Sequence, residues 1–340
     1  MLGGLLLRFV IAAVIVIAAG TVLARSGDVI AARTRLGGAW VGSIFLALAT
    51  SLPEITTDIA AVRMGAVDLA VGDLFGSSMA NMLILALISL APAGVDLFRR
   101  AALDHVLYAC LAIVMTLLAA MALQTRATIT VAGIGVSSLI LVGTYVVTSS
   151  LAFRHSTVTK EAGEVAEMGH TGDTASRVHA PAMSLQRAIL QFLGGAAVVV
   201  LVAPQFAHAA EGLADVSGVG RTFVGTWLVG LSTSLPELVT SLAAVRLRAY
   251  DLAVGNLFGS NAMNMTIFAW LDVVNGGVPV LSVASPAHLL TALVATLLTT
   301  LALGTLVLRV KRVTGAREPG SLLIVAGYVC GLALLFWHTR

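Results

Sequence analysis

The chain contains the same unit twice, at a fixed separation of 183 residues. Segment 41–87 aligns with segment 224–270 without a gap, and 27 of the 47 aligned positions are identical. The identical positions include Thr, Ser, Pro, Glu, Arg, Asp, Gly and Asn, which a shared preference for apolar residues would not bring into register. Self-similarity at a fixed separation predicts two structurally equivalent halves. Any fold of this chain must therefore place each feature of the first segment at a matching position in the other half.

The chain is also apolar over long runs, such as 9–24, 107–123 and 322–337. Apolar residues make up 58% of the 340 residues and charged residues only 11%, and the mean hydropathy is +0.98. Soluble domains carry about 25% charged residues, so a soluble fold is excluded. Cys110 and Cys330 lie within apolar runs, and we expect them to be buried small residues rather than disulfide partners. Because a helix needs roughly 20 apolar residues to cross a membrane, we predict an all-α polytopic membrane protein.

The apolar runs form five spans in each half, and the first span belongs to the repeat rather than to a cleaved signal peptide. The predicted first repeat covers 1–153, a polar linker covers 154–185, and the second repeat covers 186–340. We expect ten transmembrane helices at 5–24, 38–64, 68–91, 101–123, 128–153, 186–209, 221–247, 251–274, 285–308 and 320–338. An odd number of spans per half forces the two five-helix repeats into opposite orientations.

The distribution of Lys and Arg supports this inverted arrangement. With the N-terminus placed outside, the cytoplasmic segments hold fifteen of these residues and the outer segments hold five. Cytoplasmic loops of membrane proteins carry the excess of positive charge, so we expect both termini outside and the linker inside a plasma or inner membrane. The net charge of +3 then records topology rather than a nucleic-acid partner. Inverted repeats are typical of transporters, whose site lies near the midplane where the repeats meet.

Acidic side chains inside the predicted spans are the first candidates for that site. A carboxylate at the centre of the bilayer costs at least ~2.5–3.5 kcal/mol, so an acid retained there indicates function. Four acids fall inside the repeated spans: Glu54, Asp58, Asp73 and Glu237.

Two further aspartates, Asp68 and Asp251, begin predicted spans instead, and we interpret them as helix N-caps. His105 and His288 lie near other span starts and have no acidic residue at metal-ligand spacing in the sequence. We expect these histidines to be interfacial or hydrogen-bonded rather than metal ligands.

Both central glutamates end the sequence Thr-Ser-Leu-Pro-Glu, at 50–54 and 233–237. A serine followed by glutamate three residues later is a capping box, in which Ser51 or Ser234 begins a new helix. Proline lacks an N–H and removes the bond to the carbonyl four residues earlier, so each span should break into two half-helices. Loosened backbone at membrane depth lies in protein or lines a cavity. Hydroxyl, carbonyl and carboxylate oxygens at such a break suit Ca²⁺ or Na⁺.

Helical spacing places further polar residues beside the glutamates. One face of the broken span carries Ala47, Thr50, Ser51, Glu54 and Asp58. One face of the next helix carries Asp73, Ser77 and Asn81, and its counterparts are Asn256, Ser260 and Asn264. Interhelical hydrogen bonding is an alternative role for these serines and asparagines, and close helix packing is the expected role of the neighbouring glycines.

The paired Thr-Ser-Leu-Pro-Glu motifs, each followed by a Gly-x-x-x-Gly-Ser segment, resemble the α-repeats of the calcium/cation antiporter superfamily, in particular the sodium/calcium exchanger family. The motifs are highly specific, and the ten-span layout extends the resemblance to nearly the whole chain. The resemblance implies alternating access by two inverted five-helix halves around a four-helix ion-binding centre. It implies no catalytic residue and no cofactor, since Ca²⁺ and Na⁺ or H⁺ are substrates.

The resemblance also implies a set of cation ligands. The matching positions are the carboxylates of Glu54 and Glu237, the hydroxyls of Thr50, Ser51, Ser77, Thr233, Ser234 and Ser260, the carbonyls of Ala47 and Gly230, and the amides of Asn81 and Asn264. The sequence departs from the family at Ala49, Ser232 and Ser78, where the family usually has Gly, Gly and Asn.

Two acids have no acidic counterpart in the repeat, because Asp58 aligns with Ser241 and Asp73 aligns with Asn256. We expect one of these acids to supply the negative charge that Asn264 lacks and to make transport sensitive to pH. In the alternative, Asp73 hydrogen-bonds locally and Asp58 faces an aqueous vestibule.

The expected function is Na⁺/Ca²⁺ exchange, since two shared carboxylates can hold one Ca²⁺ or several Na⁺ but not both. A proton-coupled exchanger of Ca²⁺ or another divalent cation is the alternative, with protons competing for the buried carboxylates. An ion channel or a membrane receptor has no positive signal, because the sequence shows neither a filter motif nor an extramembrane domain. An enzyme is not expected, since no nucleophile–base constellation is present, and no obligatory protein partner is evident.

Overall fold

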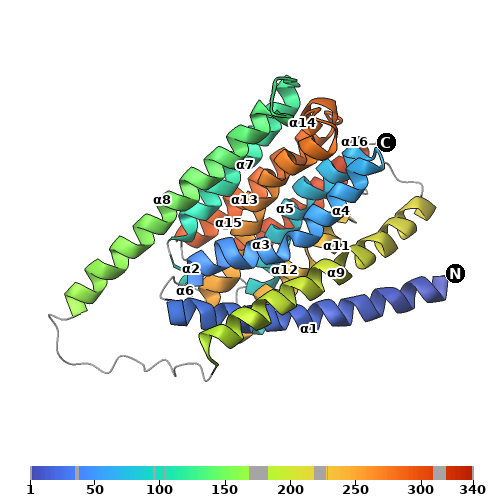
Figure 1. Cartoon of the computed structure of the whole chain (residues 1–340). Coiled ribbons are helices and arrows are strands. Elements are labelled where there is room, and N and C mark those ends of the chain that lie inside the picture. The colour runs from blue at the N-terminus through green and yellow to red at the C-terminus, as the bar shows by residue number, and fades with distance from the viewer. Residues whose placement is uncertain are drawn as a thin grey trace.

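A computed structural model describes residues 2–34, 38–94, 97–102, 104–167, 183–217, 227, 229–308 and 319–338. In Figure 1, α5, α7, α13 and α15 run roughly parallel, while α1 and α9 lie side by side and cross beneath them. The described part of the chain is helical apart from turns and one short hairpin.

The first half contains these elements in chain order: α1 (Leu2–Thr34), α2 (Gly38–Trp40), the π-helix η1 (Val41–Leu46), α3 (Ala47–Thr50), α4 (Leu52–Arg63), α5 (Val67–Leu90), the 3₁₀ turn η2 (Pro92–Gly94), α6 (Leu97–Arg100), α7 (His105–Thr125), β1 (Thr130–Val131), β2 (Ile134–Gly135) and α8 (Val136–Glu167). The second half contains α9 (Leu185–Ser217), α11 (Gly230–Thr233), α12 (Leu235–Arg246), α13 (Tyr250–Val274), α14 (Val280–Val283), α15 (His288–Leu308) and α16 (Pro319–His338).

The two halves repeat each other in structure as well as in sequence. The bounds of α3, α4 and α7 plus 183 residues are the bounds of α11, α12 and α15, and α5 and α13 begin at matching residues. The duplication predicted from the sequence is therefore present in the described helices.

Every predicted span overlaps a helix or an interrupted series of helices. The largest difference is at 128–153, where residues 130–135 form an antiparallel hairpin and α8 runs from Val136 to Glu167. The helix thus continues past the predicted start of the linker, and 168–182 lies outside the described residues. Six described helices are long and apolar enough to cross a membrane: 38–63 as one interrupted helix, α5, α7, residues 185–202 of α9, α15 and α16. The full count of ten remains a prediction.

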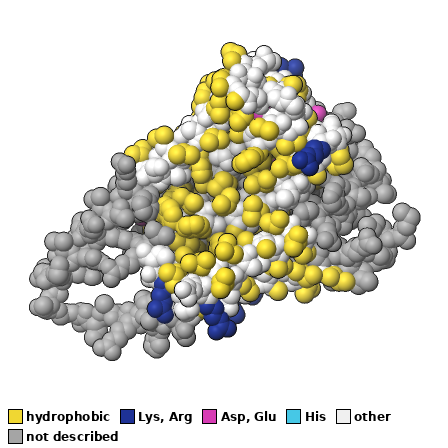
Figure 2. Space-filling model, viewed as in Figure 1, with side chains coloured by type: hydrophobic (Ala, Val, Ile, Leu, Met, Phe, Trp, Pro, Cys, Tyr) yellow, Lys and Arg dark blue, Asp and Glu magenta, His cyan; other side chains and the backbone are white. Residues whose placement is uncertain are grey.

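The surface of the bundle is apolar where a lipid bilayer would contact it. Figure 2 shows hydrophobic side chains over the middle of one face and Lys and Arg mostly toward its ends. Leu201 is 70% exposed and Trp337 is 84% exposed. Cys110 and Cys330 are also exposed, so the prediction that they are buried was wrong. Lipid chains solvate apolar residues as well as a protein core does, and sequence hydrophobicity does not distinguish the two surroundings.

Helices α5 and α13 form the centre of the bundle. The most apolar stretch of α5 is 89% buried, a larger share than in the other five described helices that are long and apolar enough to cross a membrane. Close packing here depends on glycine, as expected: a Cβ on Gly259 would collide with the backbone of Ser43 in η1. A Cβ on Gly230 would lie 2.7 Å from the backbone of Ser77. The broken helices therefore contact the central helices backbone to backbone.

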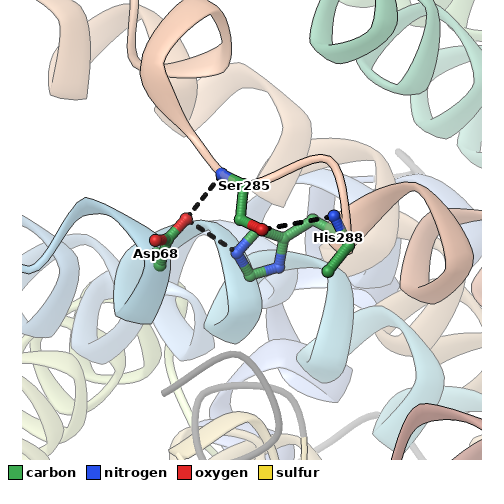
Figure 3. A network of polar contacts seen from close by, with 4 residues as sticks. Asp68, Ser285 and His288 are labelled. Carbon is green, nitrogen blue, oxygen red and sulfur yellow. Dashed lines mark hydrogen bonds and ion pairs between the residues drawn. The ribbon is translucent and has the colours of Figure 1, made fainter. Parts of the chain in front are cut away.

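The N-terminal turn of α5 is tied to the opposite repeat through Asp68. Its Oδ1 accepts hydrogen bonds from the backbone N–H of Ser285 at 2.7 Å and from His288 Nε2 at 3.2 Å (Figure 3). The N-cap residue of α5 is Ala66, so the prediction that Asp68 caps the helix was wrong. Its hydrogen-bond partners lie more than 200 residues away in the chain, and no local sequence pattern predicts them. We call this group the Asp68 clasp.

The same arrangement recurs at the N-terminal turn of α13. Asp251 Oδ1 accepts hydrogen bonds from the backbone N–H of Ala102 at 2.7 Å and from His105 Nε2 at 3.1 Å, and we call this group the Asp251 clasp. The N-cap of α13 is Ala249, so the capping prediction was wrong here too. The prediction that His105 and His288 are hydrogen-bonded is confirmed.

Candidate cation-binding site

Two broken helices meet at the centre of the bundle, one from each repeat. Ser51 separates α3 from α4 with φ −85° and ψ 0°, and Ser234 separates α11 from α12 with φ −79° and ψ 6°. Each new helix has proline at one of its first two positions, so the predicted break is confirmed. The predicted capping hydrogen bond is wrong, because neither serine side chain makes one. Both hydroxyls are buried without a hydrogen-bond partner among the described residues, which leaves them available to a ligand.

The structure buries all the predicted site residues. The fourteen residues lie on α3, α4, α5, α11, α12 and α13 or at the two serine breaks between them, and each of them is buried. Asp58 is fully buried, which contradicts the alternative in which it faces an aqueous vestibule.

The acidic side chains form one electrostatic group. Glu54 lies close enough to Glu237, Asp73 and Asp58 for their charges to interact. Neither carboxylate oxygen of Glu54 has a hydrogen-bond partner in the part of the chain that the structure describes. An ionised carboxylate buried without a partner is strongly unfavourable, so Glu54 requires a bound cation or a proton as its counter-charge.

Glu237 occupies the corresponding position on α12. Its Oε1 accepts a hydrogen bond from Ser260 at 3.3 Å, and its Oε2 has no hydrogen-bond partner among the described residues. Thr50 of the opposite repeat also lies beside this carboxylate. The two glutamates thus present unpaired carboxylate oxygens to the same polar centre.

Each motif threonine joins its broken helix to the central helix of the other repeat. The Thr50 hydroxyl lies 3.2 Å from Asn256 Oδ1, and the Thr233 hydroxyl donates to Asp73 Oδ1 at 2.8 Å. Ser77 lies 3.1 Å from Asp73 Oδ1 and 3.3 Å from the carbonyl of Gly230. The carbonyl predicted as a ligand at Gly230 therefore accepts a hydrogen bond from Ser77, a predicted hydroxyl ligand of the first repeat.

The two predicted amides differ in their contacts. Asn81 Nδ2 donates to Asn261 Oδ1 at 2.9 Å, and Asn261 Nδ2 donates to the Ser78 carbonyl at 3.2 Å. Asn81 therefore joins α5 to α13, as the interhelical alternative expected, although its Oδ1 remains without a partner among the described residues. Asn264 is fully buried, and neither of its side-chain polar atoms has a described partner. Of the two amides, Asn264 has more capacity left for an ion.

The sequence analysis overlooked Thr240 and predicted no contact between Asn256 and Ser241. In the structure, Asn256 Nδ2 donates to the hydroxyls of Thr240 and Ser241, each at 3.1 Å, and so joins α13 to α12. Asn256 had been recognised as the counterpart of Asp73, and that alignment was the available signal. In the first repeat, Thr57 and Asp58 occupy the positions of Thr240 and Ser241.

The donor atoms of this centre are hard oxygens. Among the described residues, no three His, Cys, Asp or Glu side chains converge as a metal-binding group. The candidate ligands are instead carboxylates combined with hydroxyls, amides and backbone carbonyls, which suit Na⁺ and Ca²⁺ rather than zinc or copper.

Solved structures of the sodium-calcium exchanger NCX_Mj have a similar fold. A structure of the sodium-calcium exchanger NCX_Mj soaked with 100 mM Na⁺ and 10 mM Sr²⁺ matches with a TM-score of 0.68 and 19% identity, covering 98% of this chain and 99% of that chain. A second structure of NCX_Mj, soaked with 2.5 mM Na⁺ and 0.1 mM Ca²⁺, gives a TM-score of 0.67. At this identity the likeness establishes the fold alone.

The relatives in sequence include an inner membrane protein, a sodium/calcium exchanger and a putative antiporter. Inner membrane protein YrbG of Escherichia coli (strain K12) is 25% identical over 87% of this chain and 86% of its own length. Sodium/calcium exchanger MaX1 of Methanosarcina acetivorans is 37% identical over 76 residues, which is 22% of each chain. Putative antiporter CaxA of Alkalimonas amylolytica is 27% identical over 66% of each chain.

The profile of the family described as sodium/calcium exchanger protein matches the chain twice, at residues 4–154 and 187–337. The two matches are displaced by the same 183 residues that separate the repeated segments, and together they cover most of the sequence. Two buried, partly unpaired glutamates on paired broken helices, within the fold of a known exchanger, agree with that match. The chain is therefore a multi-pass membrane transporter, not an enzyme, and it belongs to the sodium/calcium exchanger protein family.

Proposed function

We propose that this protein is a secondary active antiporter that exchanges Ca²⁺ for Na⁺ by alternating access. The observation that carries the proposal is the pairing of Glu54 and Glu237, buried and within electrostatic range of each other on the two broken helices. The names of the relatives NCX_Mj and MaX1 support Ca²⁺ and Na⁺ as the exchanged ions.

Competition for shared ligands accounts for coupling between the two ions. Ca²⁺ takes six to eight oxygen ligands, and the centre combines two carboxylates with hydroxyl, amide and carbonyl oxygens. One divalent ion neutralises Glu54 and Glu237 together, and monovalent ions neutralise them one at a time. Since neither carboxylate is stable while charged and unpaired, the empty site is disfavoured, and re-orientation occurs with ions bound.

Proton coupling is the second candidate, and one observation favours it. In the second repeat, the Asn256 amide donates to the Ser241 hydroxyl at 3.1 Å. In the first repeat, Asp73 and Asp58 occupy these two positions. Both acids lie within electrostatic range of Glu54, and acids this close in a buried centre disfavour joint ionisation, so a proton on one of them relieves the repulsion. The relative CaxA, a putative antiporter, is compatible with this reading.

We further propose ten transmembrane helices, both termini outside and the linker in the cytoplasm of a cell with this protein in its plasma or inner membrane. The excess of Lys and Arg in the segments assigned to the inside supports this topology. The relative named as an inner membrane protein supports the location.

The decisive experiment is uptake of ⁴⁵Ca²⁺ by proteoliposomes loaded with Na⁺ and diluted into Na⁺-free medium, with a parallel arm that imposes only a proton gradient. Uptake driven by the Na⁺ gradient supports the first proposal, and uptake driven only by the proton gradient supports the second. Liposomes with the Glu54→Gln/Glu237→Gln variant provide the background. No uptake above that background in either arm would overturn Ca²⁺ exchange.

A further inference from the structure

A basic cleft lies at one end of the bundle, where the segment that follows α5 meets the turn between α12 and α13. Its volume is about 400 Å³, and its charged lining residues are Arg100, Arg246 and Arg248. The described residues that line it include neither Asp nor Glu. We call it the arginine cleft.

Contacts between the two repeats bring these arginines together. Arg100 ends α6 in the first repeat, whereas Arg248 lies in the turn after α12 in the second. The Asp251 clasp holds the two segments side by side, because its carboxylate accepts a hydrogen bond at 2.7 Å from Ala102, two residues after Arg100. The guanidinium carbon of Arg100 lies 5.7 Å from the centre of the Tyr250 ring, which is within the range of a cation–π contact. The cleft is therefore built by tertiary contacts.

The backbone of Arg248 is left-handed, with φ 62°. A residue with a side chain rarely adopts this conformation, whereas glycine adopts it freely. The equivalent residue of the first repeat is glycine, Gly65, with φ 76°. The second repeat therefore carries an arginine at a position where the turn itself favours glycine. Backbone strain of this kind concentrates at functional sites.

The equivalent positions of the first repeat lack this set of side chains. Arg100 aligns with Val283, Arg248 with Gly65 and Tyr250 with Val67, and only Arg246 has a basic counterpart, Arg63. An excess of positive charge in cytoplasmic loops orients a membrane protein, but that role requires only charge somewhere in the loop. It requires neither a left-handed arginine nor a guanidinium held against an aromatic ring. Membrane topology alone does not account for the cleft.

Three guanidinium groups around one cleft suit a phosphate, since each is a planar fork that can donate two hydrogen bonds to phosphate oxygens. Basic pockets at the cytoplasmic ends of membrane-spanning helices bind anionic lipid headgroups. Leu247, between Arg246 and Arg248, is 43% exposed, and an exposed leucine beside arginines suits the boundary between headgroups and acyl chains. We propose that the arginine cleft binds the phosphate group of an anionic phospholipid.

A larger neighbouring cleft, of about 590 Å³, shares Arg100, Arg248 and Tyr250 with the arginine cleft. It is also lined by Asp28 and Asp251, so it suits an anion less well. A phosphate bound by Arg100 and Arg248 would link the two repeats at the start of α13, the helix that carries two candidate cation ligands. The proposal rests on the placement of the chain in a membrane and goes beyond Ca²⁺ exchange.

Thermal unfolding of the full-length protein in detergent micelles tests the proposal with two lipids. Phosphatidylglycerol is anionic, whereas the choline of phosphatidylcholine neutralises its phosphate. We expect phosphatidylglycerol to raise the unfolding temperature of the wild type more than phosphatidylcholine does, because a ligand of the folded state stabilises it. Equal effects of the two lipids would overturn the proposal.

Inorganic phosphate, compared with chloride at equal ionic strength, distinguishes a soluble anion from a lipid. We expect a smaller rise in the unfolding temperature with inorganic phosphate than with phosphatidylglycerol. An equal or larger rise would show that the cleft takes a soluble phosphate, and the lipid proposal would be wrong.

Variants make the measurement specific to the cleft. Arg248→Gly copies the first repeat and relieves the left-handed backbone, so it should fold at least as stably as the wild type in phosphatidylcholine. It should nevertheless lose the difference between the two lipids. Arg63→Ala is the matched control, because it removes an exposed arginine from the equivalent turn of the first repeat and should keep that difference. Equal losses in both variants would indicate a response to net charge alone and would overturn the proposal.

Native mass spectrometry detects the bound lipid directly. After incubation with an equimolar mixture of the two lipids, the wild type should retain phosphatidylglycerol that Arg248→Gly loses. Identical lipid binding by the two proteins would contradict the proposal. Neither measurement depends on transport, so an absence of ⁴⁵Ca²⁺ flux would count against the proposed exchange function and leave the lipid result valid.

Discussion

The Thr233 hydroxyl donates to Asp73 Oδ1 at 2.8 Å and so joins the broken helix of the second repeat to α5 of the first. Its counterpart is the Thr50 hydroxyl, 3.2 Å from Asn256 Oδ1. The same position accepts a hydrogen bond through an acid in one repeat and through a neutral amide in the other. The duplication has therefore kept the geometry of the centre while its charge has changed.

Neutralising either central glutamate should abolish exchange without unfolding the protein. Glu54→Gln and Glu237→Gln are nearly isosteric changes that remove an unpaired buried charge, so the unfolding temperature should be unchanged or higher. ⁴⁵Ca²⁺ flux and thermal unfolding in detergent measure the two effects. Asp104→Asn is the matched control, since Asp104 lies outside the site and its side chain makes no capping hydrogen bond. Near-normal flux in either glutamine variant would refute the site.

Bound cations should stabilise the folded protein through the same glutamates. A ligand at 100 times its dissociation constant adds about 2.7 kcal/mol to the free energy of unfolding, which shifts the unfolding temperature measurably. We expect this shift with Ca²⁺ in the wild type and its loss in Glu54→Gln. A shift that survives in the variant would show that Ca²⁺ binds elsewhere. This measurement is independent of coupling, because it detects binding alone.

Copying the second repeat into the first should remove the pH sensitivity of transport. If a proton competes with the cation at Asp58 and Asp73, the apparent affinity for Ca²⁺ rises as pH rises from 6 to 8.5. The Asp58→Ser/Asp73→Asn variant installs the Ser241–Asn256 pair in the first repeat and should flatten this dependence. Initial ⁴⁵Ca²⁺ flux at several pH values provides the measurement. If the variant keeps the wild-type pH profile and Ca²⁺ affinity, the two acids are bystanders.

The turns after α4 and α12 should face opposite sides of the membrane. Met64 and Leu247 are equivalent residues in these turns, and they are 65% and 43% exposed. A cysteine at 64 is preferred to one at 65, because Gly65 has a left-handed backbone with φ 76°. Single cysteines at these positions, in the Cys110→Ala/Cys330→Ala background, should react with an impermeant maleimide from opposite sides. Labelling from the same side would exclude inverted repeats.

A methyl group at Gly259 should destabilise the contact between α13 and η1. Its Cβ would collide with the backbone of Ser43, and overpacking of this kind costs about 1–3 kcal/mol. Gly304→Ala is the control, because nothing lies within 4 Å of a Cβ there and alanine favours a helix. Thermal unfolding should separate the two variants. Equal stability would show that α13 can move away from η1 without cost.

Features encoded by neighbouring residues were predictable from the sequence. The breaks at Ser51 and Ser234 follow from proline two residues later, and the burial of Glu54 and Glu237 follows from their place in apolar spans. Repetition at a fixed separation also predicted that Thr50 would have an equivalent partner in the other half.

Features that depend on distant contacts were not predictable. Asp68 was predicted to cap a helix because a single sequence shows only the hydrogen-bond donors within a few residues of it. Its actual donors lie in the opposite repeat. The Asn81–Asn261 hydrogen bond likewise depends on how α5 crosses α13. The exposure of Cys110 shows the same limit, since lipid and protein interiors select for the same apolar residues.

The unequal charge of the repeats makes the two halves of the buried centre different for a cation. Asp58 on α4 and Asp73 on α5 are fully buried beside Glu54 in the first repeat. Their counterparts Ser241 and Asn256 are equally buried and carry no charge. A cation bound near α4 and α5 meets two acids that a cation bound near α12 and α13 does not. The two halves of a duplicated centre should consequently differ in their affinity for the same ion.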